Sequence, residues 1–218
     1  MKNYITTHNL DEFGNEVCKL LYENYYKCIT NKGEFNIALT GGNTPKIIYN
    51  HLIKFYKEKI DWKLINIYYV DERFVNINHK ENNYYNSKLY LLDSIKNIKS
   101  VNNIPILESP EISADYYNNV VKEINIDFCL LGMGEDGHVG SIFPNSKSIN
   151  INDRLVISTK KKYNGYHRIS FTIKKINHCN FKILIINNNI KKLDILKSDD
   201  LQYPINLISD LNIISIFK

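Results

Sequence analysis

Asp136 and His138 are the two residues of this sequence whose types and spacing point most directly to catalysis. They stand two positions apart in the stretch 130–144, where four glycines fall within nine residues. A histidine titrates near neutral pH and can act as a general base, and a nearby acid can hold its ring or share its pocket. A buried strand that is followed directly by a glycine-rich turn often leads into an active-site loop. The stretch therefore predicts a catalytic loop and leaves open whether Asp136 orients His138 or binds substrate.

A second pair of glycines, Gly41 and Gly42, stands between an apolar run and the start of a predicted helix. Paired glycines let the backbone approach a ligand closely, and a helix N-terminus offers N–H groups to an anion, most often phosphate. The Gly-Lys-Ser/Thr ending of a P-loop is absent from the sequence. The alternative interpretation is a tight strand-to-helix turn in which Thr44 caps the helix.

Three charged residues, Asp71, Glu72 and Arg73, directly follow the apolar run 67–70. Charges at the end of a buried strand belong either to a solvated turn or to a site. Arg73 is one of only three arginines in the sequence, and a guanidinium suits a fixed anion better than an ammonium does. The scarcity of arginine therefore favours a role for Arg73 in a functional site over a place in a solvated turn.

The elements that must position these loops alternate along the chain. Apolar residues at three- and four-residue spacing predict helices at 11–30, 45–57, 84–92, 112–124 and 190–197. Strands are predicted at 35–40, 64–70, 126–131, 155–158, 169–173, 181–186 and 213–217. This order predicts an α/β, Rossmann-like layered fold with a mainly parallel sheet flanked by helices, in a single domain over 1–218. Ligands bind at the carboxyl ends of such strands, so we expect the three loops to meet at one edge of the sheet.

The composition narrows the class of protein. The chain has 218 residues, of which 44% are hydrophobic and 23% charged, as in ordinary globular proteins. The net charge of +5 comes from scattered lysines and not from a basic stripe with interleaved aromatics. No nucleic-acid surface is therefore predicted, although the positive charge would favour an anionic substrate.

The apolar runs and the cysteines indicate the cellular compartment of the protein. No apolar run nears the roughly 18 residues that a membrane span requires, so no membrane partner is predicted. The four cysteines form no C-x-x-C pair, which predicts buried free thiols in a reducing compartment. We therefore expect a cytoplasmic protein.

Four motifs, taken together, resemble the 6-phosphogluconolactonase family. They are LTGGNTP (39–45), VDERFV (70–75), LGMGEDGHVGSIFP (131–144) and RISFT (168–172), in the family's order and spacing over about 35–215. That family hydrolyses the lactone of 6-phosphogluconate in the pentose phosphate pathway. The resemblance implies the same reaction on a small sugar-phosphate lactone, with no metal and no organic cofactor.

The resemblance also implies a role for each site residue. His138, Asp136 and Arg73 look like the catalytic group. Arg168 and Lys191 look like phosphate partners, with the adjacent Lys192 as the alternative to Lys191. The other substrate-binding positions implied are Gly41, Gly42, Asn43, Thr44 and Asp71. The sequence departs from the family at Asn82, where a serine usually precedes the asparagine at 83.

The main rival is the related glucosamine-6-phosphate deaminases, which share the fold and the Asp-Gly-His element. Their loop has a glutamate just before the proline, where this sequence has Phe143, and they usually have a tyrosine at the position of Arg73. Both differences favour the lactonase. A non-catalytic sugar-phosphate binding module is a second alternative, against which the presence of Asp136, His138 and Arg73 argues.

The resemblance also implies one candidate protein partner. In some parasites the lactonase is the front half of a protein fused to glucose-6-phosphate dehydrogenase. That enzyme is therefore a candidate fusion partner or associate of this chain.

Overall fold

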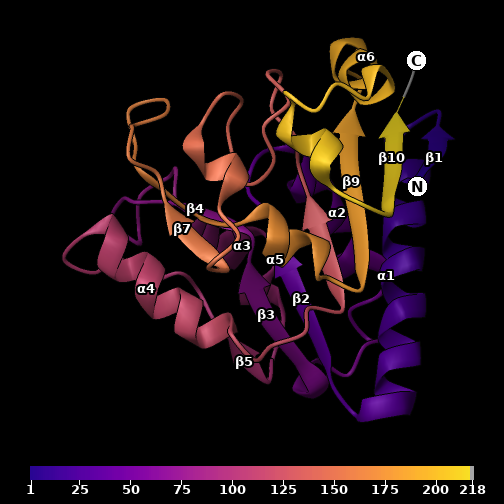
Figure 1. The fold of residues 1–218 in the computed structure, drawn as a ribbon. Coiled ribbons are helices and arrows are strands. Elements are labelled where there is room, and N and C mark those ends of the chain that lie inside the picture. The colour runs from indigo at the N-terminus through magenta and orange to yellow at the C-terminus, as the bar shows by residue number, and fades with distance from the viewer. Residues whose placement is uncertain (217–218) are drawn as a thin grey trace.

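A seven-stranded sheet is the main feature of the computed structural model, which describes residues 1–216 (Figure 1). The strand order is β1-β10-β9-β6-β2-β3-β5, and every neighbouring pair is parallel. This confirms the predicted layered α/β fold, and Phe217 of the predicted last strand lies outside the described residues. The strands are β1 (Lys2–Thr7), β2 (Phe35–Leu39), β3 (Ile65–Tyr69), β5 (Ser100–Val101), β6 (Phe128–Leu131), β9 (Phe181–Asn187) and β10 (Leu211–Ile216).

The direction in which the chain builds this sheet reverses between β2 and β6. From β2 the chain proceeds through β3 to β5 at one edge, and from β6 it proceeds through β9 to β10 toward the other. In open α/β sheets, ligands bind outside the carboxyl ends of the strands at such a switch point. The two glycine-rich loops follow β2 and β6, so they lie on either side of this crevice.

A small antiparallel sheet adjoins the carboxyl end of β3. It contains β4 (Asp71–Arg73), β8 (Arg168–Phe171) and β7 (Val156–Ser158), in the order β4-β8-β7. Val70 joins the two sheets, since its N–H donates to the Leu39 carbonyl at 2.9 Å and its own carbonyl accepts from the Phe171 N–H at 2.8 Å. The prediction that Asp71–Arg73 form a loop is therefore wrong, because the chain pairs again as soon as it leaves β3.

The helices pack on both sheets. α1 (Leu10–Lys32) contacts α2 (Thr44–Phe55) and β10, and α2 also contacts β9. α4 (Pro110–Val121) and α5 (Ile173–Asn177) contact β8 of the small sheet. α3 (Asn83–Tyr90) packs on α2 and β4, and α6 (Ile190–Ser198) follows β9 (Figure 1).

The central strands β2, β3 and β6 are buried at every position, as expected for parallel strands covered on both faces. All four cysteines are free thiols, as predicted, and three are buried, whereas Cys28 is only partly buried. Across residues 1–216, no helix combines the length and the apolar character that would carry it through a membrane.

Candidate active site

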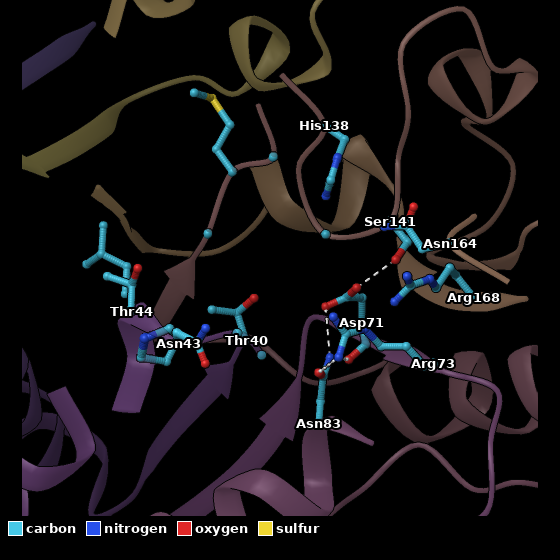
Figure 2. A pocket seen from close by; sticks show the side chains of 18 of the residues that line it. Thr40, Asn43, Thr44, Asp71, Arg73, Asn83, His138, Ser141, Asn164 and Arg168 are labelled. Carbon is cyan, nitrogen blue, oxygen red and sulfur yellow. Dashed lines mark hydrogen bonds between the residues drawn. The ribbon is translucent and has the colours of Figure 1, made fainter. Parts of the chain in front are cut away.

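A cavity of about 250 Å³ opens at the carboxyl ends of the central strands (Figure 2). Residues from all three predicted loops line it, so the prediction that these loops meet at one edge is confirmed. The predicted site residues that line the cavity are Gly41, Gly42, Asn43, Thr44, Asp71, Arg73, His138 and Arg168. Asp136 and Lys191 are the two that lie outside it.

His138 points into the cavity from the loop after β6 (Figure 2). Its Nδ1 lies 2.6 Å from Oδ1 of Asp136, and its backbone N–H donates to the same oxygen at 3.3 Å. A carboxylate on Nδ1 fixes the ring and leaves Nε2 as the nitrogen that can take a proton. Because Asp136 is exposed and lies outside the cavity, this geometry favours its role in orienting His138 over binding substrate.

Gly134 forms the surface on which the His138 ring rests. A Cβ atom at position 134 would overlap Cε1 and Nδ1 of the imidazole. The backbone of the same glycine also bonds to the histidine, since Gly134 N–H donates to the His138 carbonyl at 3.0 Å. The glycine therefore allows the close approach that seats the ring beside Asp136.

Arg73 and Arg168 face each other across the β4–β8 pair and both line the cavity. Arg73 Nη1 donates to the Glu81 carbonyl at 2.7 Å and to Asn83 Oδ1 at 3.1 Å. Arg168 is only 6% exposed, its Nη2 donates to the Tyr163 carbonyl at 3.1 Å, and within the described chain its buried Nε has no partner. Burial lowers the pKa of Arg168, and the neighbouring Arg73 lowers it further. Two adjacent guanidinium groups with an unused donor form a strong site for an anion.

Asp71 is held by two side chains that the sequence analysis did not single out. Its Oδ2 accepts from Ser141 Oγ at 2.6 Å, and its Oδ1 accepts from Asn83 Nδ2 at 3.3 Å (Figure 2). Asn83 Nδ2 also donates to the Asp71 backbone carbonyl at 2.8 Å. The amide of Asn83 lies so close to Gly41 that a Cβ there would overlap it. Asn83 thus connects the glycine loop to Asp71 and Arg73. The only sequence signal for this role of Asn83 was the asparagine that the family has at this position.

Glu72 is fully buried behind this network. Its carboxylate accepts the backbone N–H groups of Arg73 at 2.7 Å, Asn83 at 2.7 Å and Tyr84 at 3.0 Å. Two of these donors belong to the first turn of α3, where a negative charge is favoured. Burial raises the pKa of Glu72 to about 8, although the three N–H groups oppose the rise.

Replacing Glu72 with glutamine is expected to flatten the dependence of stability on pH. The folded pKa of about 8 lies above the ordinary value of 4.5, so the folded protein binds more protons than the unfolded chain between these values. Stability from this group is therefore complete below about pH 4.5 and falls as the pH rises toward 8. Urea denaturation of both proteins at pH 5 and pH 8 measures the difference. An unchanged pH dependence in the variant would contradict it, and Glu58→Gln, at an exposed glutamate, is the control.

The glycine loop after β2 ends at the N-terminus of α2. The alternative interpretation, in which Thr44 caps this helix, is wrong in its choice of cap, because Thr44 is the first residue of the helix and Asn43 occupies the capping position. Within residues 1–216, the Asn43 side chain makes no capping hydrogen bond. Pro45 has no N–H, and the Lys46 N–H donates to the Asn43 carbonyl at 3.2 Å, so of the first three residues of α2 Thr44 alone keeps a backbone N–H for another partner within residues 1–216.

The lysine that reaches the cavity is Lys192 and not Lys191. Lys192 lines the cavity from α6, whereas Lys191 is exposed on another side of the helix, since adjacent helical residues point about 100° apart. Burial lowers the pKa of Lys192, and Glu135 and Asp136 oppose this. The choice of Lys191 is thereby corrected by one position.

Phe143 completes the wall beside His138. It is 7% exposed, and its ring centroid lies 4.6 Å from that of the imidazole. An apolar ring therefore stands where the deaminases have an acid. Among residues 1–216, no group of three or more His, Cys, Asp or Glu side chains is arranged to hold a metal ion.

The chain is similar to known proteins over most of its length. A family model described as glucosamine-6-phosphate isomerases/6-phosphogluconolactonase matches residues 8–213. The chain is 31% identical to a 6-phosphogluconolactonase from Synechocystis sp., with 84% of this chain and 80% of that protein covered. It is 33% identical to a 6-phosphogluconolactonase from Haemophilus influenzae, with 78% and 77% covered.

Solved structures share the fold. A 6-phosphogluconolactonase from Thermotoga maritima superposes with a TM-score of 0.88 at 22% identity, over the whole of both chains. A monomeric glucosamine-6-phosphate deaminase superposes with a TM-score of 0.80 at 15% identity, over 98% of this chain and 97% of that chain. The fold is thus common to both chemistries, and the extent of the family match establishes that the chain belongs to the glucosamine-6-phosphate isomerase/6-phosphogluconolactonase family.

Proposed function

We propose that this chain hydrolyses 6-phospho-D-glucono-1,5-lactone to 6-phosphogluconate, the second step of the oxidative pentose phosphate pathway. The observation that carries the proposal is the pairing, in one cavity, of an Asp136-oriented His138 with the adjacent cations Arg73 and Arg168. The names of the curated relatives support the same reaction.

The proposed mechanism uses His138 as general base and then as general acid. Nε2 takes a proton from a water molecule, whose oxygen attacks the lactone carbonyl carbon. The oxyanion that develops is stabilised by the Arg73 guanidinium or by backbone N–H groups of the glycine loop. The bond between that carbon and the ring oxygen then breaks, and His138 returns the proton to the leaving oxygen. Asp136 stabilises the imidazolium between the two transfers.

The phosphate is proposed to bind Arg168 together with Lys192. Binding energy from this remote group holds the lactone carbon beside His138. The unused Nε of Arg168 supports this assignment, since a phosphate oxygen would supply the partner that this atom lacks within the described residues.

Arg168→Ala is expected to raise KM for the lactone by about 10- to 100-fold with a smaller effect on kcat, because it removes charge-assisted bonds to a non-reacting group. Steady-state kinetics on freshly made lactone measure the two constants. Arg154→Ala is the matched control, since Arg154 lies outside the cavity and pairs with Asp115. A collapsed kcat with unchanged KM would instead assign Arg168 to the chemistry.

The test of the proposed function is a lactonase assay corrected for spontaneous hydrolysis, which is fast for δ-lactones. The assay contains EDTA, so that it also tests the proposed independence from metal. Lactone hydrolysis above the background supports the proposal. Ammonia release from glucosamine 6-phosphate would establish the deaminase alternative. A thermal shift with 6-phosphogluconate but no turnover would establish a binding module.

We also propose that the protein works in the cytoplasm. The four free thiols support a reducing compartment. Fusion to, or association with, glucose-6-phosphate dehydrogenase stays a prediction of the family resemblance.

A further inference from the structure

The ring of Phe143 contacts two other rings. The His138 imidazole lies 4.6 Å away, centroid to centroid, at an interplanar angle of 42°. The Tyr163 ring lies parallel to that of Phe143, at 3.5 Å and 4°. Tyr163 belongs to the hairpin 159–167 between β7 and β8, whereas the other two residues belong to the loop after β6. The three rings therefore join two separate parts of the chain.

Tyr163 is itself fixed by its hairpin. Its N–H donates to the Tyr166 carbonyl at 2.8 Å, and the Tyr166 N–H donates back to the Tyr163 carbonyl at 3.3 Å. The Tyr163 carbonyl also accepts from Arg168 at 3.1 Å. The next residue, Asn164, reaches the cavity wall beside Ser141 and Arg168 (Figure 2). The ring of Tyr163 thus supports the base side of the cavity, while its backbone supports the anion side.

The His138 imidazole has three restraints. Asp136 holds Nδ1, Gly134 lies under the ring, and Phe143 packs beside it. The third restraint depends on Tyr163, because its ring stacks on that of Phe143 at 3.5 Å and so limits the movement of the Phe143 ring.

We propose that Tyr163 is a positioning residue for His138, acting through the ring of Phe143. This inference rests on the proposed lactone hydrolysis, in which His138 is the base. Nothing in the proposed chemistry requires a tyrosine at this position, so its contribution is the stacked ring and not the hydroxyl.

Tyr163→Ala is expected to lower kcat for the lactone by about 3- to 10-fold, the range that one stacked aromatic pair would account for. KM should stay unchanged, because Arg168 bonds to the backbone carbonyl of residue 163, which the substitution keeps. Tyr163→Phe retains the stacked ring and should restore kcat. Tyr166→Ala is the matched control, since Tyr166 lies on the same hairpin but packs on His79; it should keep the wild-type kcat.

A spectroscopic measurement makes the test independent of turnover. The imidazole NMR signals of His138, assigned by their loss in His138→Ala, should shift in Tyr163→Ala and stay in place in Tyr166→Ala. Thermal unfolding confirms that each variant is folded.

Two outcomes would overturn the proposal. One is a folded Tyr163→Ala protein with wild-type kcat and unmoved His138 signals. The other is an equal loss of kcat in Tyr166→Ala, which would assign the effect to the hairpin as a whole. A wild-type protein without lactonase activity would reject the proposed function instead, and the NMR comparison would then decide the positioning role.

Discussion

His138→Ala is expected to lower kcat for lactone hydrolysis by roughly 10²- to 10⁴-fold, the usual contribution of a positioned general base. Folding should be retained, because the His138 side chain is 30% exposed and its ring packs at the surface of the cavity instead of in the core. Initial rates on freshly made lactone, corrected for spontaneous hydrolysis, give kcat. Circular dichroism reports on folding.

The control for this variant is His178→Ala, which removes an exposed histidine outside the cavity. It should turn over at the wild-type rate. Near-normal turnover by a folded His138→Ala protein would reject the histidine as the base and with it the proposed mechanism.

Gly134→Ala is expected to lower kcat by about 10²-fold, the cost of moving a catalytic group by about 1 Å. The added methyl group would overlap the His138 ring and the Asp136 carboxylate, both of which are side chains that can move. The backbone at position 134 does not have a positive φ, so alanine itself is not strained there. The melting temperature should therefore change little while activity falls.

A double-mutant cycle tests whether Gly134 acts through His138. If it does, the variant carrying both substitutions should be no less active than His138→Ala alone, because the effects of coupled residues do not add. Additive losses would mean that the methyl group damages the site by another route.

The arrangement of the three loops was predictable because it follows from general properties of parallel sheets. Apolar runs that end in glycines or charges identify strands and the ends at which they carry a site. The position of β4 was not predictable in this way. Asp71–Arg73 have the composition of a loop, and only pairing with a partner that lies about 97 positions away in sequence makes them a strand.

Three further features could not be read from a sequence pattern. The strand β1 was missed because half of its residues are exposed at the sheet edge, which leaves no apolar run to detect. The choice between Lys191 and Lys192 depends on the rotation of α6 about its axis. Asn83 was not singled out because asparagine is common in this sequence, and its role arises from contacts with Asp71 and Gly41.

The junction at Val70 has a consequence for selectivity. The proposed base stands on a loop of the large sheet, whereas Arg168 stands on a strand of the small one, and Val70 is hydrogen-bonded into both. The backbone thereby sets the separation between the reacting carbon and the anion. The cavity is therefore expected to select substrates by the distance between carbonyl and phosphate. Phosphorylated lactones whose carbonyl lies one carbon nearer to the phosphate, or one carbon farther from it, should be poor substrates.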